Sequence, residues 1–78
     1  MILEIITPEK EVFNGDVSSV KFPGESGEFE VLSNHASIIS TLTSGNIRVI
    51  TIEDKTENFI INGGVIEMKQ NKIIVLAD

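Results

Sequence analysis

Short apolar segments recur along this chain at the length of a β-strand, and residues that favour turns separate one segment from the next. The separators lie at residues 7–9, 14–15, 23–27, 43–45, 54–55, 63–64 and 70–71. Ile, Val and Thr, which favour strands, make up 25 of the 78 residues, whereas Ala occurs twice and Leu four times. This pattern predicts an all-β fold. Its regular spacing suits a compact sandwich or barrel, and we expect a small sandwich of two mostly antiparallel sheets.

Several segments alternate apolar with polar residues, which is typical of strands that have one buried and one wet face. Residues 19–22, 28–31 and 66–69 follow this pattern, whereas residues 59–61 and 73–76 are apolar on both faces. A covered sheet, a strand that passes between sheets, or a surface for a partner would each explain the continuous runs. We favour the two structural explanations, because short apolar runs are common in small cores.

The length allows one domain, residues 1–78, and no linker or internal repeat divides it. Because there is no Cys, neither a disulfide nor a thiolate metal site supplements the core. The formal net charge of −6 and the absence of Trp and Tyr argue against binding to nucleic acid or anionic lipid. The N-terminus lacks the basic start of a signal peptide, and no apolar run is long enough to insert into a membrane. We therefore expect a soluble, cytoplasmic chain.

No catalytic or phosphate-binding motif is present. The serines, the single His35 and the three aspartates form no nucleophile elbow, and no phosphate-cradling glycine loop occurs. A lone histidine in a polar loop is more often a turn or packing residue than a ligand. Glu25, Glu28 and Glu30 lack the spacing of known calcium loops. We expect no catalysis, no metal and no cofactor.

The segment from Phe22 to Ala36 combines a glycine-bounded turn, a short alternating strand and a polar loop, and it resembles the ε subunit of rotary ATP synthases. The positions that carry this resemblance are Gly24, Gly27, Glu28, Phe29, Val31, Leu32, His35 and Ala36. The likeness continues at Leu3, Val12, Phe13, Gly15, Val17, Val20, Leu42, Gly45, Ile47, Arg48 and residues 7–9, 63–64 and 75–78. It therefore covers effectively the whole chain.

The resemblance implies the N-terminal β-sandwich of that family. Longer members continue into two helices that can inhibit ATP hydrolysis and in some cases bind ATP, whereas this sequence stops at Asp78. We therefore expect neither inhibition nor ATP binding from these residues. The start at Met favours a bacterial or plastid-encoded origin over an imported mitochondrial one.

By resemblance, the chain is a non-catalytic central-stalk (rotor) subunit of the F1 sector. It would link the γ subunit to the c ring in a proton-translocating ATP synthase, at the cytoplasmic face of the inner (plasma) membrane. The resemblance places Ser26, Gly27, Glu28 and Phe29 against the c ring, and Asn34, His35 and Ala36 against γ. The glycines and glutamates of the first segment are equally explained as a soluble strand connection.

The main alternative is a small biotinyl or lipoyl carrier domain modified at Lys69, because such domains present a lysine beside Met on a hairpin. Met68 and Lys69 fit superficially, but Gln70 stands where biotinyl domains usually have Met, and Lys69 lies close to the end of the chain. A generic oligonucleotide-binding β module would need more basic residues and more exposed aromatic rings than this sequence has.

Overall fold

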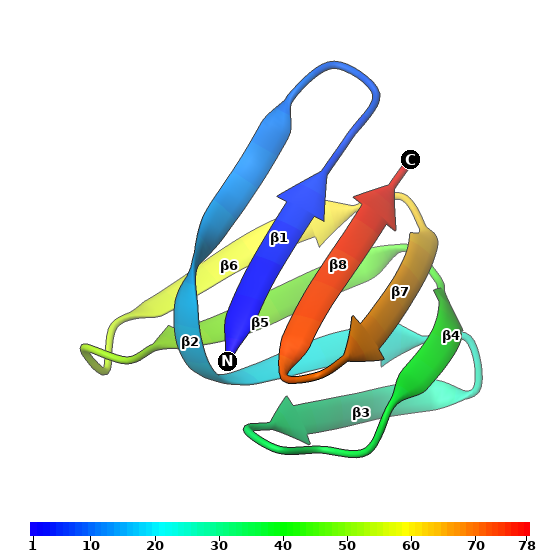
Figure 1. Cartoon of the computed structure of the whole chain (residues 1–78). Coiled ribbons are helices and arrows are strands. Elements are labelled where there is room, and N and C mark those ends of the chain that lie inside the picture. The colour runs from blue at the N-terminus through cyan, green and yellow to red at the C-terminus, as the bar shows by residue number, and fades with distance from the viewer.

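The computed structural model describes all 78 residues. It contains eight strands and no helix, and therefore no helix that could cross a membrane. The strands are β1 (Ile2–Ile6), β2 (Glu11–Gly24), β3 (Gly27–Leu32), β4 (Ile38–Leu42), β5 (Gly45–Thr51), β6 (Thr56–Ile61), β7 (Gly64–Lys69) and β8 (Lys72–Ala77). Figure 1 shows them in two layers that cross at an angle. The all-β prediction is confirmed.

The long strand β2 belongs to both layers. Its first half, up to Asp16, pairs with β1, and its second half, from Val17 onward, pairs with β5 and β3. The first layer therefore consists of the first half of β2 with β1, β8, β7 and β4, and the second layer consists of β6, β5, the second half of β2 and β3. At the far edge, Gly24 of β2 meets Leu42 of β4, so the two layers also join there.

Strand pairing follows the expected sandwich of mostly antiparallel sheets. Only the pair β1–β8 is parallel, and every other pairing is antiparallel. The structure adds that hydrogen bonds run continuously from one layer into the other through β2.

The core lies between the two layers and is apolar. Sixteen hydrophobic residues are buried there, and the largest completely buried side chain is that of Phe22. Phe13 packs edge-on against Phe59 at the margin of the core, with ring centroids 5.5 Å apart. Burial of this kind is the main stabilising contribution available to a chain without disulfides.

The predicted alternation is observed on β7, where Ile66 and Met68 are buried while Glu67 and Lys69 are exposed. On β2 the pattern is interrupted, because Ser19 is buried beside Val20. The pairing register with β5 shifts between Val17 and Ser19, and an irregularity of this kind turns consecutive residues toward the same side. The shift lies where β2 passes from one layer to the other.

For the two apolar runs we favoured a covered sheet or a strand that passes between sheets, and this prediction is wrong. Ile73 and Val75 are in the core, but Leu76 is 52% exposed, and Ile60 of the other run is 80% exposed. Neither strand changes layers, and no element covers the outer face of β8 or of β6. The third explanation, an apolar surface open to a partner, is the one that the structure leaves.

Candidate interaction surfaces

The two segments singled out from the sequence lie at opposite ends of strand β3. The β2–β3 turn, with Ser26, precedes β3, and the loop with Asn34, His35 and Ala36 follows it. The first segment ends at Phe29, the third residue of β3, so residues 30–33 separate it from Asn34, which corresponds to at most roughly 17 Å at 3.3 Å per residue. The structure therefore does not bring the two candidate sites together, and one molecule can offer both at the same time.

The β2–β3 turn is exposed at its tip and packed at its base. Ser26, Gly27 and Glu28 are exposed, whereas Phe29 is half-buried and its ring lies 5.5 Å from that of Phe22. Gly24 lies beneath this ring: a Cβ at Gly24 would come within 2.7 Å of Phe29 and 2.5 Å of the Gly27 carbonyl oxygen. Phe29 thus anchors the turn to the core, while the three residues before it are free to contact another molecule.

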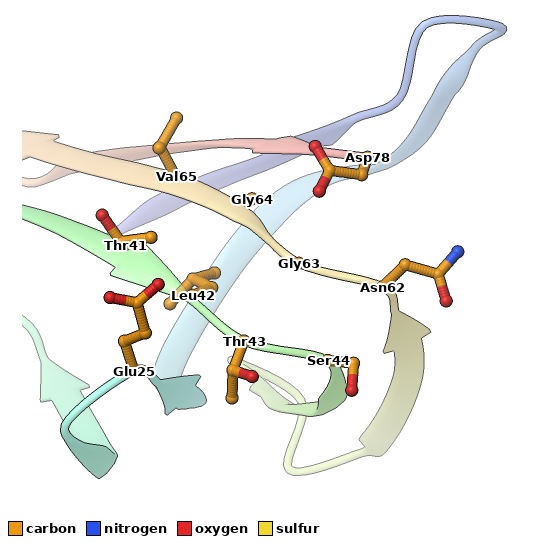
Figure 2. Close-up of a pocket in the computed structure, with 10 residues that line it drawn as sticks. All are labelled: Glu25, Thr41, Leu42, Thr43, Ser44, Asn62, Gly63, Gly64, Val65 and Asp78. Atoms are coloured by element: carbon orange, nitrogen blue, oxygen red, sulfur yellow. The ribbon is translucent and has the colours of Figure 1, made fainter.

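Neighbouring turns reinforce this end of the sandwich. The Glu25 N–H donates to the Thr41 carbonyl at 3.1 Å, and the Thr43 N–H donates to the Pro23 carbonyl at 2.9 Å. Figure 2 shows an open, mostly polar pocket of about 410 Å³ between these turns, with the carboxylates of Glu25 and Asp78 on different sides of it. The pocket contains no basic side chain, so this end of the molecule has acidic character.

Charged residues on the outer face of the second layer are already paired with one another. Glu30 accepts a hydrogen bond from Arg48 at 3.0 Å, and Lys21 lies 3.3 Å from the Glu28 carboxylate. These pairs are partly exposed, and such pairs contribute about 0.2–1 kcal/mol each. This face is therefore polar, and its charged side chains largely have partners within the chain.

The loop after β3 is exposed at all three predicted residues. Asn34 has a φ of 64°, the left-handed conformation that Asn tolerates better than most residues. The His35 N–H donates to the Leu32 carbonyl at 3.2 Å, and Nδ1 of the ring lies 2.9 Å from the Ala36 carbonyl oxygen. The histidine therefore contacts only its own loop, and its other ring edge faces outward.

An apolar patch lies beside this loop on the outer face of the first layer. Ile39 of β4 is 82% exposed, and it lies next to Val65, Ile74 and Leu76 of β7 and β8 around a hollow of about 270 Å³. The loop leads directly into β4, which carries Ile39. The patch also adjoins the β2–β3 turn, because Ile39 and Val65 line a second hollow together with Glu25 and Ser26. Sequence reasoning flagged the run at residues 73–76 but missed Ile39 and Val65. The adjacent isoleucines at positions 38 and 39 were the signal that both faces of β4 are apolar.

Potential metal ligands do not cluster in the structure. No three His, Asp or Glu residues lie close enough to hold a metal ion. Lys69, the candidate attachment residue of the carrier alternative, is the last residue of β7 and pairs with Lys72 across the following turn.

The family model for the ATP synthase delta/epsilon chain β-sandwich domain matches residues 1–78, the whole chain. The chain therefore belongs to this family of ATP synthase subunits. Membership confirms the resemblance seen in residues 22–36 and identifies a non-catalytic type of subunit. It gives the carrier alternative at Lys69 no support.

Curated relatives carry the name ATP synthase epsilon chain. The chain is 51% identical to the one from Campylobacter curvus and 46% identical to the one from Nitratiruptor sp., with 97% of this chain covered in each case. It spans 59% of the length of both relatives.

Two solved assemblies contain a chain with the same fold. One is the Euglena gracilis mitochondrial ATP synthase OSCP/F1/c-ring, with a TM-score of 0.90, 18% identity and coverage of 99% of this chain and 49% of that one. The other is the central stalk/c-ring of the Tetrahymena thermophila mitochondrial ATP synthase, with a TM-score of 0.79, 17% identity and coverage of 99% and 62%. At these identities the likeness shows the fold alone.

Replacing Gly24 with Ala tests whether the turn base is as tightly packed as the geometry indicates. The added methyl group must displace the Phe29 ring or the Gly27 carbonyl, so we expect the free energy of unfolding to fall by about 1–3 kcal/mol. Gly15→Ala is the matched control in the same strand, because its Cβ would meet only the Phe13 ring, at 3.3 Å. Urea denaturation of the two variants measures the difference, and equal stabilities would contradict the packing described here.

Proposed function

We propose that residues 1–78 form the attachment domain of a central-stalk rotor subunit, binding the γ subunit at one end of β3 and the ring of c subunits at the other. The domain would lie at the cytoplasmic face of the inner (plasma) membrane as a peripheral component. The observation that carries this proposal is that the two exposed segments, Ser26–Glu28 and Asn34–Ala36, lie at the two ends of β3. A linker between two partners needs two such surfaces that do not compete.

Coupling requires that force applied at one attachment reaches the other without loss in the domain between them. β3 is hydrogen-bonded to β2 along its whole length, from Ser19↔Leu32 to Gly24↔Gly27. β2 in turn holds both layers of the sandwich together. A displaced turn would therefore have to deform the packed core, which resists deformation because interiors are close-packed.

The γ contact is proposed for the loop Asn34–Ala36 together with the apolar patch around Ile39 and Leu76. An interface needs a fully buried apolar centre and a polar rim. The patch would supply the apolar centre, and the exposed loop before β4 would supply part of the rim. The outer face of the second layer suits this contact less, because its charges are already paired with one another. Ile60 of that layer lines a hollow of about 260 Å³, but its neighbours Val12 and Phe59 are less exposed than Val65 and Leu76 of the first layer.

The c-ring contact is proposed for the exposed tip Ser26, Gly27 and Glu28, with Phe29 holding the tip from below. Glu25, which has no ion-pair partner within the chain, gives the tip a negative charge that suits Arg or Lys side chains in polar loops of the ring. Glu28 lies 3.3 Å from Lys21, and it would exchange this exposed partner for a basic side chain of the ring. Such exposed contacts are individually weak, at about 0.2–1 kcal/mol each. For these residues we propose attachment only, and no inhibition of ATP hydrolysis.

Ile39→Ser tests the γ surface. Because Ile39 is 82% exposed, we expect stability to change little, whereas affinity for isolated γ subunit falls about tenfold through loss of a buried isoleucine, a contribution of roughly 1.5 kcal/mol or more. Ile60→Ser is the matched control at 80% exposure on the second layer, and it should bind γ like the unmodified chain. Calorimetric titration of γ with each variant measures the two affinities. A tenfold loss for Ile60→Ser and none for Ile39→Ser would place γ on the opposite face.

Glu28→Gln tests the ring surface. We expect binding to isolated c ring to weaken by about two- to fivefold at low salt, with a smaller salt dependence, because one surface ion pair is lost. Binding to γ should not change, since Glu28 lies at the other end of β3 from the Asn34–Ala36 loop and lines neither hollow beside Ile39. Glu57→Gln on β6 removes the same charge from an exposed site that the proposal leaves uninvolved. If both variants bind the ring equally well, the tip is not the ring contact.

A further inference from the structure

Three segments that are distant in sequence meet at the end of the sandwich that carries the Asn34–Ala36 loop. The Asn34 backbone N–H donates to Oδ1 of Asn71 at 2.8 Å, across 37 positions of sequence. The carbonyl of Asn71 accepts the N–H of Ile2 at 3.1 Å. One partly buried residue in the β7–β8 turn thus holds the exposed loop through its side chain and the start of β1 through its backbone carbonyl.

The turn itself restricts which residue can occupy position 71. Gln70 and Asn71 have φ values of 53° and 62° and connect Lys69 directly to Lys72. Two central residues with positive φ are the mark of a type I′ hairpin turn, in which Gly, Asn and Asp are favoured. Gly would satisfy the turn without supplying an acceptor. Asn and Asp satisfy the turn and also supply an oxygen for the Asn34 N–H.

This hydrogen bond is the only one from residues 33–37 to another part of the fold. The other backbone hydrogen bond of the loop, from the His35 N–H to the Leu32 carbonyl, stays within the segment, as does the contact between the His35 ring and Ala36. Without Asn71, the loop would be fixed only at its two ends, by β3 and β4.

We propose that Asn71 is a positioning residue that holds Asn34–Ala36 in the conformation in which the γ subunit binds it. The proposal rests on the proposed function, because it assigns Asn71 a role in that same contact. Asn71 acts through the loop: an untethered loop samples further conformations, and the apparent affinity falls by the fraction that remains competent to bind.

The test compares Asn71→Gly with Asn71→Asp in the full chain, using isolated γ subunit as the ligand. Both residues suit the turn, but only Asp retains the acceptor oxygen. We expect Asn71→Gly to bind γ about two- to tenfold more weakly, the range that one ordinary hydrogen bond supplies, and Asn71→Asp to bind within twofold of the unmodified chain. Asn62→Asp, in the turn before β7 at the other end of the molecule, controls for the added charge.

Hydrogen exchange at the Asn34 amide gives a second measurement that does not depend on γ. We expect this amide to be protected in the unmodified chain and in Asn71→Asp, and to exchange faster in Asn71→Gly. An unprotected Asn34 amide in the unmodified chain would overturn the proposal even if Asn71→Gly did not fold.

The outcomes separate this inference from the function on which it rests. If the unmodified chain does not bind γ, the proposed function fails. If γ binds the unmodified chain and Asn71→Gly equally well, although the Asn34 amide exchanges faster in the variant, only the positioning role is overturned. Equal weakening in Asn71→Gly and Asn71→Asp would likewise overturn it, since the acceptor oxygen would then not matter.

Discussion

The whole structure depends on β2 being longer than the molecule can accommodate as a straight strand. Fourteen extended residues would span about 45 Å, whereas the longest dimension of the domain is 27 Å. The strand therefore bends near Val17, pairs with β1 before the bend and with β5 and β3 after it, and so folds the sheet over its own apolar face. The core forms inside this fold, and no disulfide is needed to close it.

Bending one sheet over itself leaves two outer faces and two ends that differ in chemistry. The second layer carries paired charges such as Glu30 with Arg48, while the first carries the apolar patch around Ile39. At one end the turns contain glycines with positive φ, and at the other the positive-φ residues are Asn34, Asp54, Gln70 and Asn71. A small domain thus presents surfaces of different chemistry, as the proposed coupling role between two partners would require.

Most of the fold was predictable from the sequence, because local patterns encode it: the alternation of residues 66–69 marks a real strand, and most turn signals mark real connections. The separator predicted at residues 14–15 was wrong, because Asn14 and Gly15 lie within β2 and pair with β1. The bend in β2 was not, since the burial of Ser19 depends on a register shift against β5. The apolar runs at residues 38–39 and 73–76 signalled two apolar faces, but they could not decide whether Ile39 and Leu76 are exposed, because that depends on which strand faces meet the second layer. The hydrogen bond between Asn34 and Asn71 joins residues 37 positions apart, so no local sequence pattern predicts it.

The claim that one domain holds two partners at once is tested most directly by an ordered binding measurement. Fluorescently labelled chain would be bound to immobilised γ subunit, purified c ring would then be added, and the release of label would be followed. We expect the ring to bind while the chain stays on γ, because the two surfaces lie at opposite ends of β3. Displacement of the chain from γ by the ring would show that the partners share one surface, and that result would contradict the proposed linkage.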